Sequence, residues 1–296
     1  MVGRTHEHGV LRAGELLMRR ILVTGCGGPA GRAVRELLLQ RGHSVLAVDM
    51  KPSRTAGIER VPPANDPDFV SELERLARQS PCDLVIPTVS EELPILADQW
   101  DRDGIPIMLG SSNSIRIADD KFASCEHLRF RGVAVPGYRL PSWKSDGLGW
   151  PLISKPRIGR GGREVVVHES EKTLQALDDG YILQEFIPST EFAPNIYYND
   201  DRSTCIVLKK TKLKQGIVGN ASAVMRVDEP DIAELALDAA EAIGLSGPID
   251  MDIRRRWDGT AVVLDVNARF GANITCAPEV LDAALEDFLH GEHSLT

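Results

Sequence analysis

The 296-residue sequence has no cysteine pair at zinc-binding spacing and no long apolar run. Its five cysteines are scattered and odd in number, which argues against a structural zinc site and favours reduced thiols in a cytosol. No apolar stretch reaches the roughly 18 to 20 residues that a membrane helix needs. We therefore expect a cytoplasmic protein without a membrane partner.

Positive charge is also scarce. The chain has 34 Lys and Arg against 43 Asp and Glu, for a net charge of -9 at pH 7. A nucleic-acid-binding protein needs a basic face to displace counterions, so we expect no nucleic-acid partner. A nucleotide substrate is not excluded, because a few local lysines can hold a triphosphate inside an acidic protein.

The first 18 residues lack the apolar core of a signal peptide. They contain His6 and His8, which we interpret as part of a disordered tip and not as metal ligands. We predict a disordered extension over residues 1–18, ahead of a natural start near Met18.

Residues 19–112 alternate short apolar runs with helical repeats. Ile21–Thr24 and Val45–Val48 are candidate buried strands, and the helical repeat between them ends at Gly42. Such alternation implies a parallel sheet with helices on both faces. We predict a Rossmann-like domain here. After Ser112 the pattern changes, and from Tyr181 strands dominate, so we expect an α+β fold with antiparallel strands in the second half.

A hairpin is predicted around Asp258 and Gly259. Asp-Gly favours a two-residue turn, so Trp257 should pair with Thr260. The flanking segments, residues 249–254 and 261–266, have the apolar alternation of strands.

This register would bring four oxygen-bearing side chains to one face of the hairpin. Asp252 should lie opposite Asp265, and Asp250 opposite Asn267. Opposed carboxylates repel each other unless a cation lies between them, and carboxylate and amide oxygens suit magnesium. A solvated acidic face, or a bulge that breaks the register, is the alternative.

A glycine-rich connection, KPRIGRGG over residues 155–162, joins two predicted strands. Its glycines would let backbone N–H groups approach phosphate oxygens, and Lys155 adds a positive charge. The chain has no GxxxxGK[ST] loop. Taken alone, a flexible hairpin loop explains the segment equally well.

Three further segments have simpler interpretations when taken alone. Tyr181–Ile187 is an apolar strand with a polar end that could meet an adenine edge, and Glu191 could bind ribose, although a partly exposed strand end also fits. We interpret the basic stretch from Lys209 to Lys214 as a solvated strand face, although Lys210, Lys212 and Lys214 share one side of a strand and one of them could meet a nucleotide. Arg254–Arg256 is interpreted as a solvated run near a turn, although Arg254 shares the face of the opposed carboxylates and could reach a phosphate.

Together, these motifs resemble the ATP-grasp superfamily, above all the branch similar to the carbamoyl-phosphate synthetase large subunit. The resemblance covers nearly the whole chain from Arg20. The motifs that carry it, in order, are IPTVSEE at residues 86–92, Lys121, Lys155 with its glycine loop, QEFI at residues 184–187, Glu191 and DVNAR at residues 265–269.

The resemblance implies an α/β chain in which a Rossmann-like N-terminal (pre-ATP-grasp) domain precedes a two-lobed α+β ATP-grasp domain. The implied boundaries are residues 19–112 for the first domain, 113–180 for the small lobe and 181–296 for the large lobe.

The resemblance also implies site roles. The ATP-binding residues would be Lys121, Lys155, Gly159, Gly161, Gly162, Gln184, Glu185, Phe186, Ile187 and Glu191. Magnesium, or manganese in its place, would be bound by Asp252, Asp265 and Asn267. Arg269 and Lys155 would be the catalytic residues, with Arg269 steadying a phosphate or a substrate carboxylate. Asp265 stands where such proteins more often have Glu, which leaves the number of metal ions open.

The implied activity is an ATP-dependent carboxylate–amine ligase that forms an acyl phosphate and releases ADP and phosphate. Its partners would be small-molecule carboxylate and amine substrates, and a second subunit, as in a homodimer, is one way to complete their pocket. Within the same superfamily, a carbamoyl-phosphate-type kinase step stays open.

Two other functions remain as alternatives. An NAD-dependent oxidoreductase could use the GxxGxxG turn at residues 25–31, with Asp49 on the ribose. The chain, however, lacks the Tyr-x-x-x-Lys of a short-chain dehydrogenase. A nucleotide-binding protein without activity would not require the opposed Asp252 and Asp265.

Overall fold

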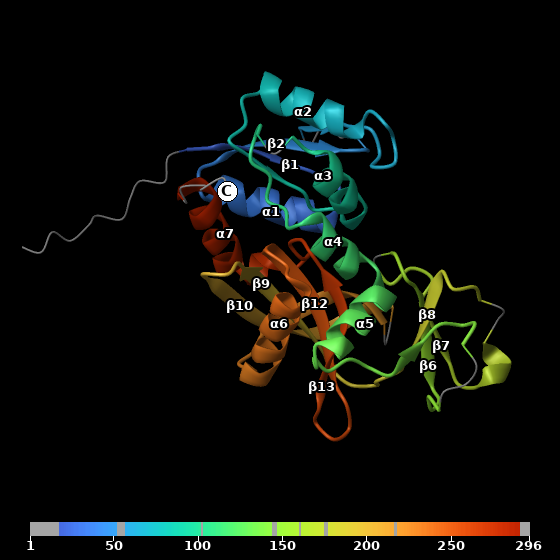
Figure 1. Ribbon diagram of the computed structural model, residues 1–296. Coiled ribbons are helices and arrows are strands. Elements are labelled where there is room, and N and C mark those ends of the chain that lie inside the picture. Colours follow the sequence, from blue (N-terminus) through green and yellow to red (C-terminus); the bar gives the residue numbers. More distant parts are fainter. Residues whose placement is uncertain are drawn as a thin grey trace, which may run out of the picture.

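The computed structural model describes residues 18–51, 57–101, 103–143, 147–159, 161–174, 177–215 and 218–290. The predicted extension over residues 1–18 lies outside these ranges except for Met18. Three sheets of four, five and four strands form the molecule (Figure 1). Within the described ranges, no helix has the length and apolar character needed to cross a membrane.

The N-terminal sheet is parallel, with strand order β3-β2-β1-β4. Its strands are β1 (Arg20–Val23), β2 (Ser44–Asp49), β3 (Ile58–Arg60) and β4 (Leu84–Ile86). Helix α1 (Pro29–Gln40) covers one face, and α2 (Phe69–Gln79) and α3 (Leu93–Gln99) cover the other (Figure 1). Apolar side chains alternate between the two cores, because successive strand residues point to opposite faces. Beside β4, Ile107 forms an isolated parallel bridge with Val85.

The small-lobe sheet is antiparallel, with strand order β5-β8-β6-β7. Its strands are β5 (Tyr138–Arg139), β6 (Leu152–Pro156), β7 (Val166–His168) and β8 (Tyr181–Glu185). We had expected residues from Tyr181 onward to belong to the large lobe. Instead β8 pairs with β6 from Leu152↔Glu185 to Pro156↔Tyr181, so the large-lobe sheet begins only after β8.

Two helices, α4 (Ser112–Asp119) and α5 (Lys121–Phe130), connect the N-terminal sheet to the small lobe. Asp120 ends the first helix and begins the second, and its carboxylate accepts the N–H groups of Phe122 and Ala123. This N-cap fixes the first residue of α5, which is Lys121.

The large-lobe sheet has strand order β11-β10-β9-β12-β13. Its strands are β9 (Glu191–Tyr198), β10 (Ser203–Gln215), β11 (Val218–Arg226), β12 (Gly247–Arg255) and β13 (Ala261–Asn267). Helix α6 (Pro230–Ile243) packs on one face through Ile196, Ile249 and Met251. The C-terminal helix α7 (Pro278–His290) shares a core with α1, so the N-terminal domain and the large lobe are joined by apolar packing.

Candidate active site

The β12–β13 hairpin turns through a longer loop than predicted. Arg256 donates its N–H to the carbonyl of Thr260 (2.8 Å), so Trp257 does not pair with Thr260 as we expected. Asp-Gly here belongs to a three-residue loop, in which Gly259 takes the left-handed conformation (φ 89°) that a bulge-type turn requires.

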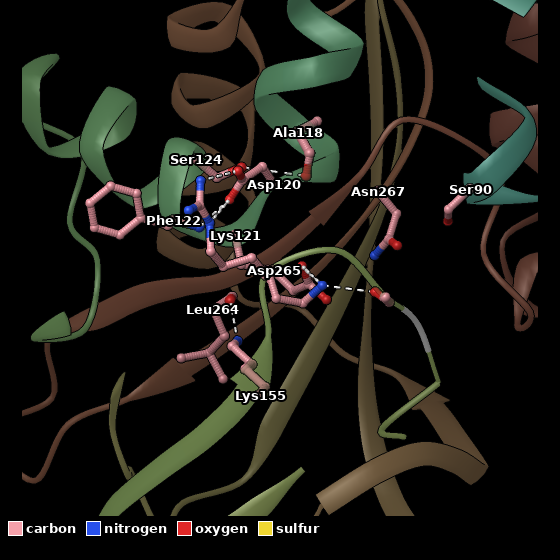
Figure 2. A network of polar contacts seen from close by, with 12 residues as sticks. Ser90, Ala118, Asp120, Lys121, Phe122, Ser124, Lys155, Leu264, Asp265 and Asn267 are labelled. Atoms are coloured by element: carbon pink, nitrogen blue, oxygen red, sulfur yellow. Dashed lines mark hydrogen bonds and ion pairs between the residues drawn. The ribbon is translucent and has the colours of Figure 1, made fainter. Parts of the chain in front are cut away.

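A β-bulge compensates for this difference. Ile253 pairs with Val263, whereas Asp252 pairs with Asp265, so Leu264 is the extra residue. Its carbonyl accepts a hydrogen bond from Lys155 Nζ (2.8 Å), which ties the small lobe to the hairpin (Figure 2).

Beyond the bulge, the predicted pairs are present. Asp252 lies opposite Asp265, and Asp250 lies opposite Asn267. The four side chains face one cavity, because alternate strand residues share a face. The expected clustering is therefore confirmed, although the turn that suggested it was assigned incorrectly.

Three polar rows cross the large-lobe sheet in parallel. We call them the ion-pair row (Lys210, Glu191, Arg254), the metal row (Asp252, Asp265) and the inner row (Asn195, Asp250, Asn267). Each row contains one residue of β12, namely Arg254, Asp252 and Asp250 in turn. These residues are two positions apart, so all three rows lie on one face of the sheet.

The ion-pair row is nearly closed to solvent. Lys210 Nζ lies 2.5 Å from Glu191 Oε1 and 2.6 Å from Asp252 Oδ1, and Arg254 Nε lies 2.9 Å from Glu191 Oε2. Burial alone would lower the pKa of Lys210, but the attraction of Asp252 and Glu191 raises it well above its usual range. Lys210 therefore stays charged and neutralises part of the metal row.

Lys210 and Arg254 were missed as site residues. We had interpreted both as solvated, yet their side chains are only 7% and 6% exposed. The signal was present in the strand alternation, because Arg254 and Asp252 share a face. The sequence could not show that β10 lies beside β9, where the Glu191 carboxylate binds the side chains of Lys210 and Arg254.

Two lysines, Lys121 and Lys155, lie near Asp265 of the metal row (Figure 2). Lys121 Nζ donates to the carbonyl of Gly159 (2.8 Å) and lies 3.6 Å from Asp265 Oδ1. Burial lowers the pKa of Lys155, and the nearby carboxylate of Asp265 opposes that shift. Gly161 and Gly162, both with positive φ, continue the loop along the cavity.

Arg269 links the hairpin to the N-terminal domain. Its Nε donates to Ser90 Oγ (2.9 Å), and its Nη2 donates to Asn267 Oδ1 (3.0 Å). These contacts fix the guanidinium beside the metal row, at the end of the cavity nearest the N-terminal domain.

Residues 184–187 line the cavity, but several of their polar groups are already paired. The Glu185 carboxylate binds Arg256 (2.8 Å), and the Gln184 amide donates to Cys125 Sγ (3.1 Å). Their role in binding adenine stays a prediction.

A cavity of about 670 Å³ contains every site residue predicted from the sequence. Its volume is in the range of small-molecule sites. The lining from the predicted set is Lys121, Lys155, Gly159, Gly161, Gly162, Gln184, Glu185, Phe186, Ile187, Glu191, Asp252, Asp265, Asn267 and Arg269. The far wall comes from the N-terminal domain, through the glycine turn (residues 25–31) and Thr88 and Val89.

The metal row fits magnesium bound together with a nucleotide. Burial and the neighbouring Asp252 raise the pKa of Asp250 to about 7. Several carboxylates thus lie close together, and a bound cation would reduce the repulsion between them. In the part of the chain that the structure describes, no three His, Cys, Asp or Glu side chains form a ready metal cage. Asp252, Asp265 and Asn267 leave positions for phosphate oxygens and water, which is the arrangement magnesium prefers.

Comparison with known proteins agrees with this geometry. Residues 118–273 match the family model of the ATP-grasp domain. The chain belongs to the ATP-grasp family. A segment of 117 residues is 28% identical to the carbamoyl phosphate synthase large chain of Mycobacterium sp. (strain JLS), and covers 37% of this chain but only 10% of that relative.

Solved structures share the ATP-grasp fold over most of the chain. L-amino acid ligase from Bacillus licheniformis superposes with a TM-score of 0.73 at 18% identity, covering 92% of this chain and 74% of that one. N5-carboxyaminoimidazole synthetase from Staphylococcus aureus, complexed with ADP, gives a TM-score of 0.66 at 17% identity, covering 86% and 71%. The expected mixed α/β ATP-grasp fold is confirmed, while the Rossmann-like label of the N-terminal domain stays a prediction.

Proposed function

We propose that the protein is an ATP-dependent ligase that joins a small-molecule carboxylate to an amine through an acyl phosphate. The observation that carries this proposal is the single cavity in which two lysines, a glycine loop, opposed carboxylates and Arg269 converge. The family membership of residues 118–273 supports the nucleotide, and the C–N ligases among the similar folds support the reaction class.

The nucleotide would lie across the polar rows. The strand end at residues 184–187 would take the adenine, and Glu191 the ribose. Lys121, Lys155 and the glycines from Gly159 to Gly162 would hold the phosphates, because they face the metal row across the cavity. Magnesium held by Asp252, Asp265 and Asn267 would neutralise phosphate charge.

The reaction would proceed in two displacements. A carboxylate oxygen of the substrate attacks the γ-phosphorus, and the bond to the β-phosphate oxygen breaks, releasing ADP. The amine nitrogen then attacks the acyl carbon, phosphate leaves with the electron pair of the C–O bond, and the amine loses a proton to solvent. Arg269 steadies the carboxylate and then the leaving phosphate, because Ser90 and Asn267 hold its guanidinium at that end of the cavity.

Closure of the glycine loop would protect the acyl phosphate from water. Lys121 donates to the carbonyl of Gly159 and lies 3.6 Å from Asp265 Oδ1, so this lysine links the base of the loop to the metal row. We also propose a cytoplasmic location, which the free thiols of all five cysteines support.

Product analysis tests the proposal. ATP should be converted to equal amounts of ADP and phosphate in the presence of the correct pair from a matrix of amino acids and amines. Hydroxylamine should intercept the acyl phosphate as a hydroxamate. Release of AMP and pyrophosphate would refute the γ-phosphoryl mechanism, and substrate-dependent reduction of NAD without ATP consumption would favour the oxidoreductase.

A further inference from the structure

Arg163 is a charged residue of the cavity to which the sequence motifs assign no role. It follows the glycines of the loop and lines the cavity beside Gly161, Gly162 and Val165. Within the described ranges, no hydrogen bond or ion pair reaches its guanidinium. An arginine keeps its charge at any working pH and presents five N–H donors, so an unpaired guanidinium in a cavity is suited to bind an anion.

The neighbouring arginines of the small lobe and the hairpin have structural partners. Arg157 binds the Asp120 carboxylate through Nη2 (2.5 Å) and Nε (3.1 Å). Arg256 binds Glu185 (2.8 Å). A shortage of carboxylates does not explain the difference, because the chain has 43 Asp and Glu against 34 Lys and Arg. The charge of Arg163 is therefore left for a ligand.

The backbone beside Arg163 is strained. Glu164 has a φ of 56°, and it is the only non-glycine residue with a positive φ in the described part of the chain. This left-handed conformation is unfavourable for a residue with a Cβ atom, whereas Gly161 (72°) and Gly162 (70°) adopt it without that cost. Such strain persists only where the surrounding contacts hold it, and it is concentrated at functional sites.

Tyr181 supplies the contact that holds Glu164. Its Oη donates to Glu164 Oε2 (2.5 Å). Tyr181 is the first residue of β8 and pairs with Pro156 of β6, so this hydrogen bond ties the loop to the small-lobe sheet. Neither Tyr181 nor Glu164 is among the described residues that line the cavity. Their hydrogen bond can therefore act on a ligand only through the residue that they position.

The metal row lies near the base of the same loop. Lys121 donates to the carbonyl of Gly159 (2.8 Å) and lies 3.6 Å from Asp265 Oδ1. Arg163 is four positions further along the loop and faces the same cavity. Phosphates placed at the metal row would thus meet Arg163 from the small-lobe side. A guanidinium can donate to two phosphate oxygens at once.

We propose that Arg163 binds the β- and γ-phosphates of the nucleotide, and that the hydrogen bond between Tyr181 and Glu164 positions it. This inference rests on the proposed function and adds to it a phosphate-binding residue and two positioning residues. Arg163 would offset the phosphate charge that the metal and the two lysines leave unbalanced.

Titration calorimetry with Mg-ATP and with AMP tests the role of Arg163 without requiring turnover. Arg163→Gln should weaken Mg-ATP binding by about tenfold, as loss of a charged hydrogen bond does, and leave AMP binding within about twofold. The side chain is exposed, so the melting temperature without ligand should not change. Lys172→Gln removes an exposed positive charge of the same lobe that is outside the cavity lining, and it should change neither affinity.

Two further variants test the positioning role. Tyr181→Phe should weaken Mg-ATP binding by about threefold, the range of one neutral hydrogen bond. Glu164→Gln should retain wild-type affinity, because its amide oxygen can still accept from Tyr181. Adding Tyr181→Phe to Arg163→Gln should cause no further loss, since Tyr181 acts through Arg163. A merely structural tyrosine would weaken binding by the same factor in both backgrounds.

The outcomes separate this inference from the ligase proposal. Wild-type affinity for Mg-ATP in Arg163→Gln overturns the inference. An equal loss for AMP and Mg-ATP also overturns it, because Arg163 would then serve the nucleoside end of the site. Additive losses in the double variant overturn the positioning role of Tyr181. A wild-type protein that binds no Mg-ATP would refute the proposed function, and this inference with it.

Discussion

Asp265 is the residue at which the lobes of the site meet. It lies opposite Asp252 across the hairpin and 3.6 Å from Lys121 of α5, and its charge opposes the lowering of the Lys155 pKa by burial. One carboxylate thus influences groups from three separate elements, β12, α5 and β6.

We predict that Asp265→Asn lowers turnover by at least about 100-fold, the upper end of what loss of an outer metal-site partner costs. The amide keeps the shape but removes a charged ligand. The melting temperature without ligand should stay the same or rise, because the repulsion with Asp252 is relieved. Asp258→Asn at the exposed tip of the same hairpin is the control. Normal turnover in Asp265→Asn would show that the metal role is wrong.

Asp119 should make stability depend on pH. It is the last residue of α4, where the helix dipole disfavours a negative charge. Burial raises its pKa to about 6; Lys121 opposes the shift, and Glu91 and Asp265 add to it. A carboxyl whose pKa is higher in the folded than in the unfolded chain binds more protons when folded, so it costs stability as pH rises from about 4 to 6.

Asp119→Asn should therefore raise the melting temperature at pH 7.5 and change it less at pH 4. Thermal denaturation of both proteins between these pH values measures the difference. Asp103→Asn, an exposed loop carboxylate, controls for the change in net charge. An equal effect of Asp119→Asn at both pH values would mean that the carboxyl is not destabilised by its surroundings.

At the scale of elements, the ion-pair row holds strands β9, β10 and β12 in one register. Lys210 of β10 reaches both Glu191 of β9 and Asp252 of β12. Removing one partner of a buried ion pair leaves the other charges uncompensated, and that costs about 3–5 kcal/mol. Here the loss would leave Glu191 and Asp252 to repel each other.

We predict that Lys210→Met lowers the free energy of unfolding by about 3 kcal/mol. Methionine preserves most of the apolar stem, so the effect reports the charge. Lys209→Met is the matched control, because the adjacent strand residue points to the opposite face. Urea denaturation of both variants measures the difference. Equal stabilities would show that Lys210 is dispensable for the sheet.

Much of the hairpin could be predicted from the sequence, since apolar alternation fixes which residues share a face. The pairing of Asp252 with Asp265 followed from that pattern. The three-residue loop shifts the register by one residue, and the bulge at Leu264 shifts it back. The pairs Asp252–Asp265 and Asp250–Asn267 are therefore the same as with a two-residue turn, so the sequence pattern could reveal neither irregularity. Strand neighbours were harder to predict: the pairing of β8 with β6 and the approach of Lys210 to Glu191 depend on distant segments.

At the scale of the molecule, the cavity has walls from all three sheets. Arg269 of the large lobe binds Ser90 of the N-terminal domain, and α7 shares a core with α1. Lys155 of the small lobe donates to Leu264 of the large lobe. A ligand in this cavity would therefore contact the N-terminal domain, the small lobe and the large lobe at once.

Mg-ATP should accordingly stabilise the whole protein, and NAD or NADP should not. At about 100 times its dissociation constant, a ligand adds roughly 2.7 kcal/mol to the free energy of unfolding. The glycine turn offers less to a dinucleotide, because the Asp49 carboxylate expected on its ribose already accepts the N–H of Gly27 (2.9 Å). The melting temperature should rise with Mg-ATP and rise less with ATP and EDTA, since the phosphates would then face Asp252 and Asp265 without a cation between them. Magnesium alone is the control. Stabilisation by NAD and none by Mg-ATP would contradict the proposed function and favour an NAD-dependent oxidoreductase that uses the glycine turn.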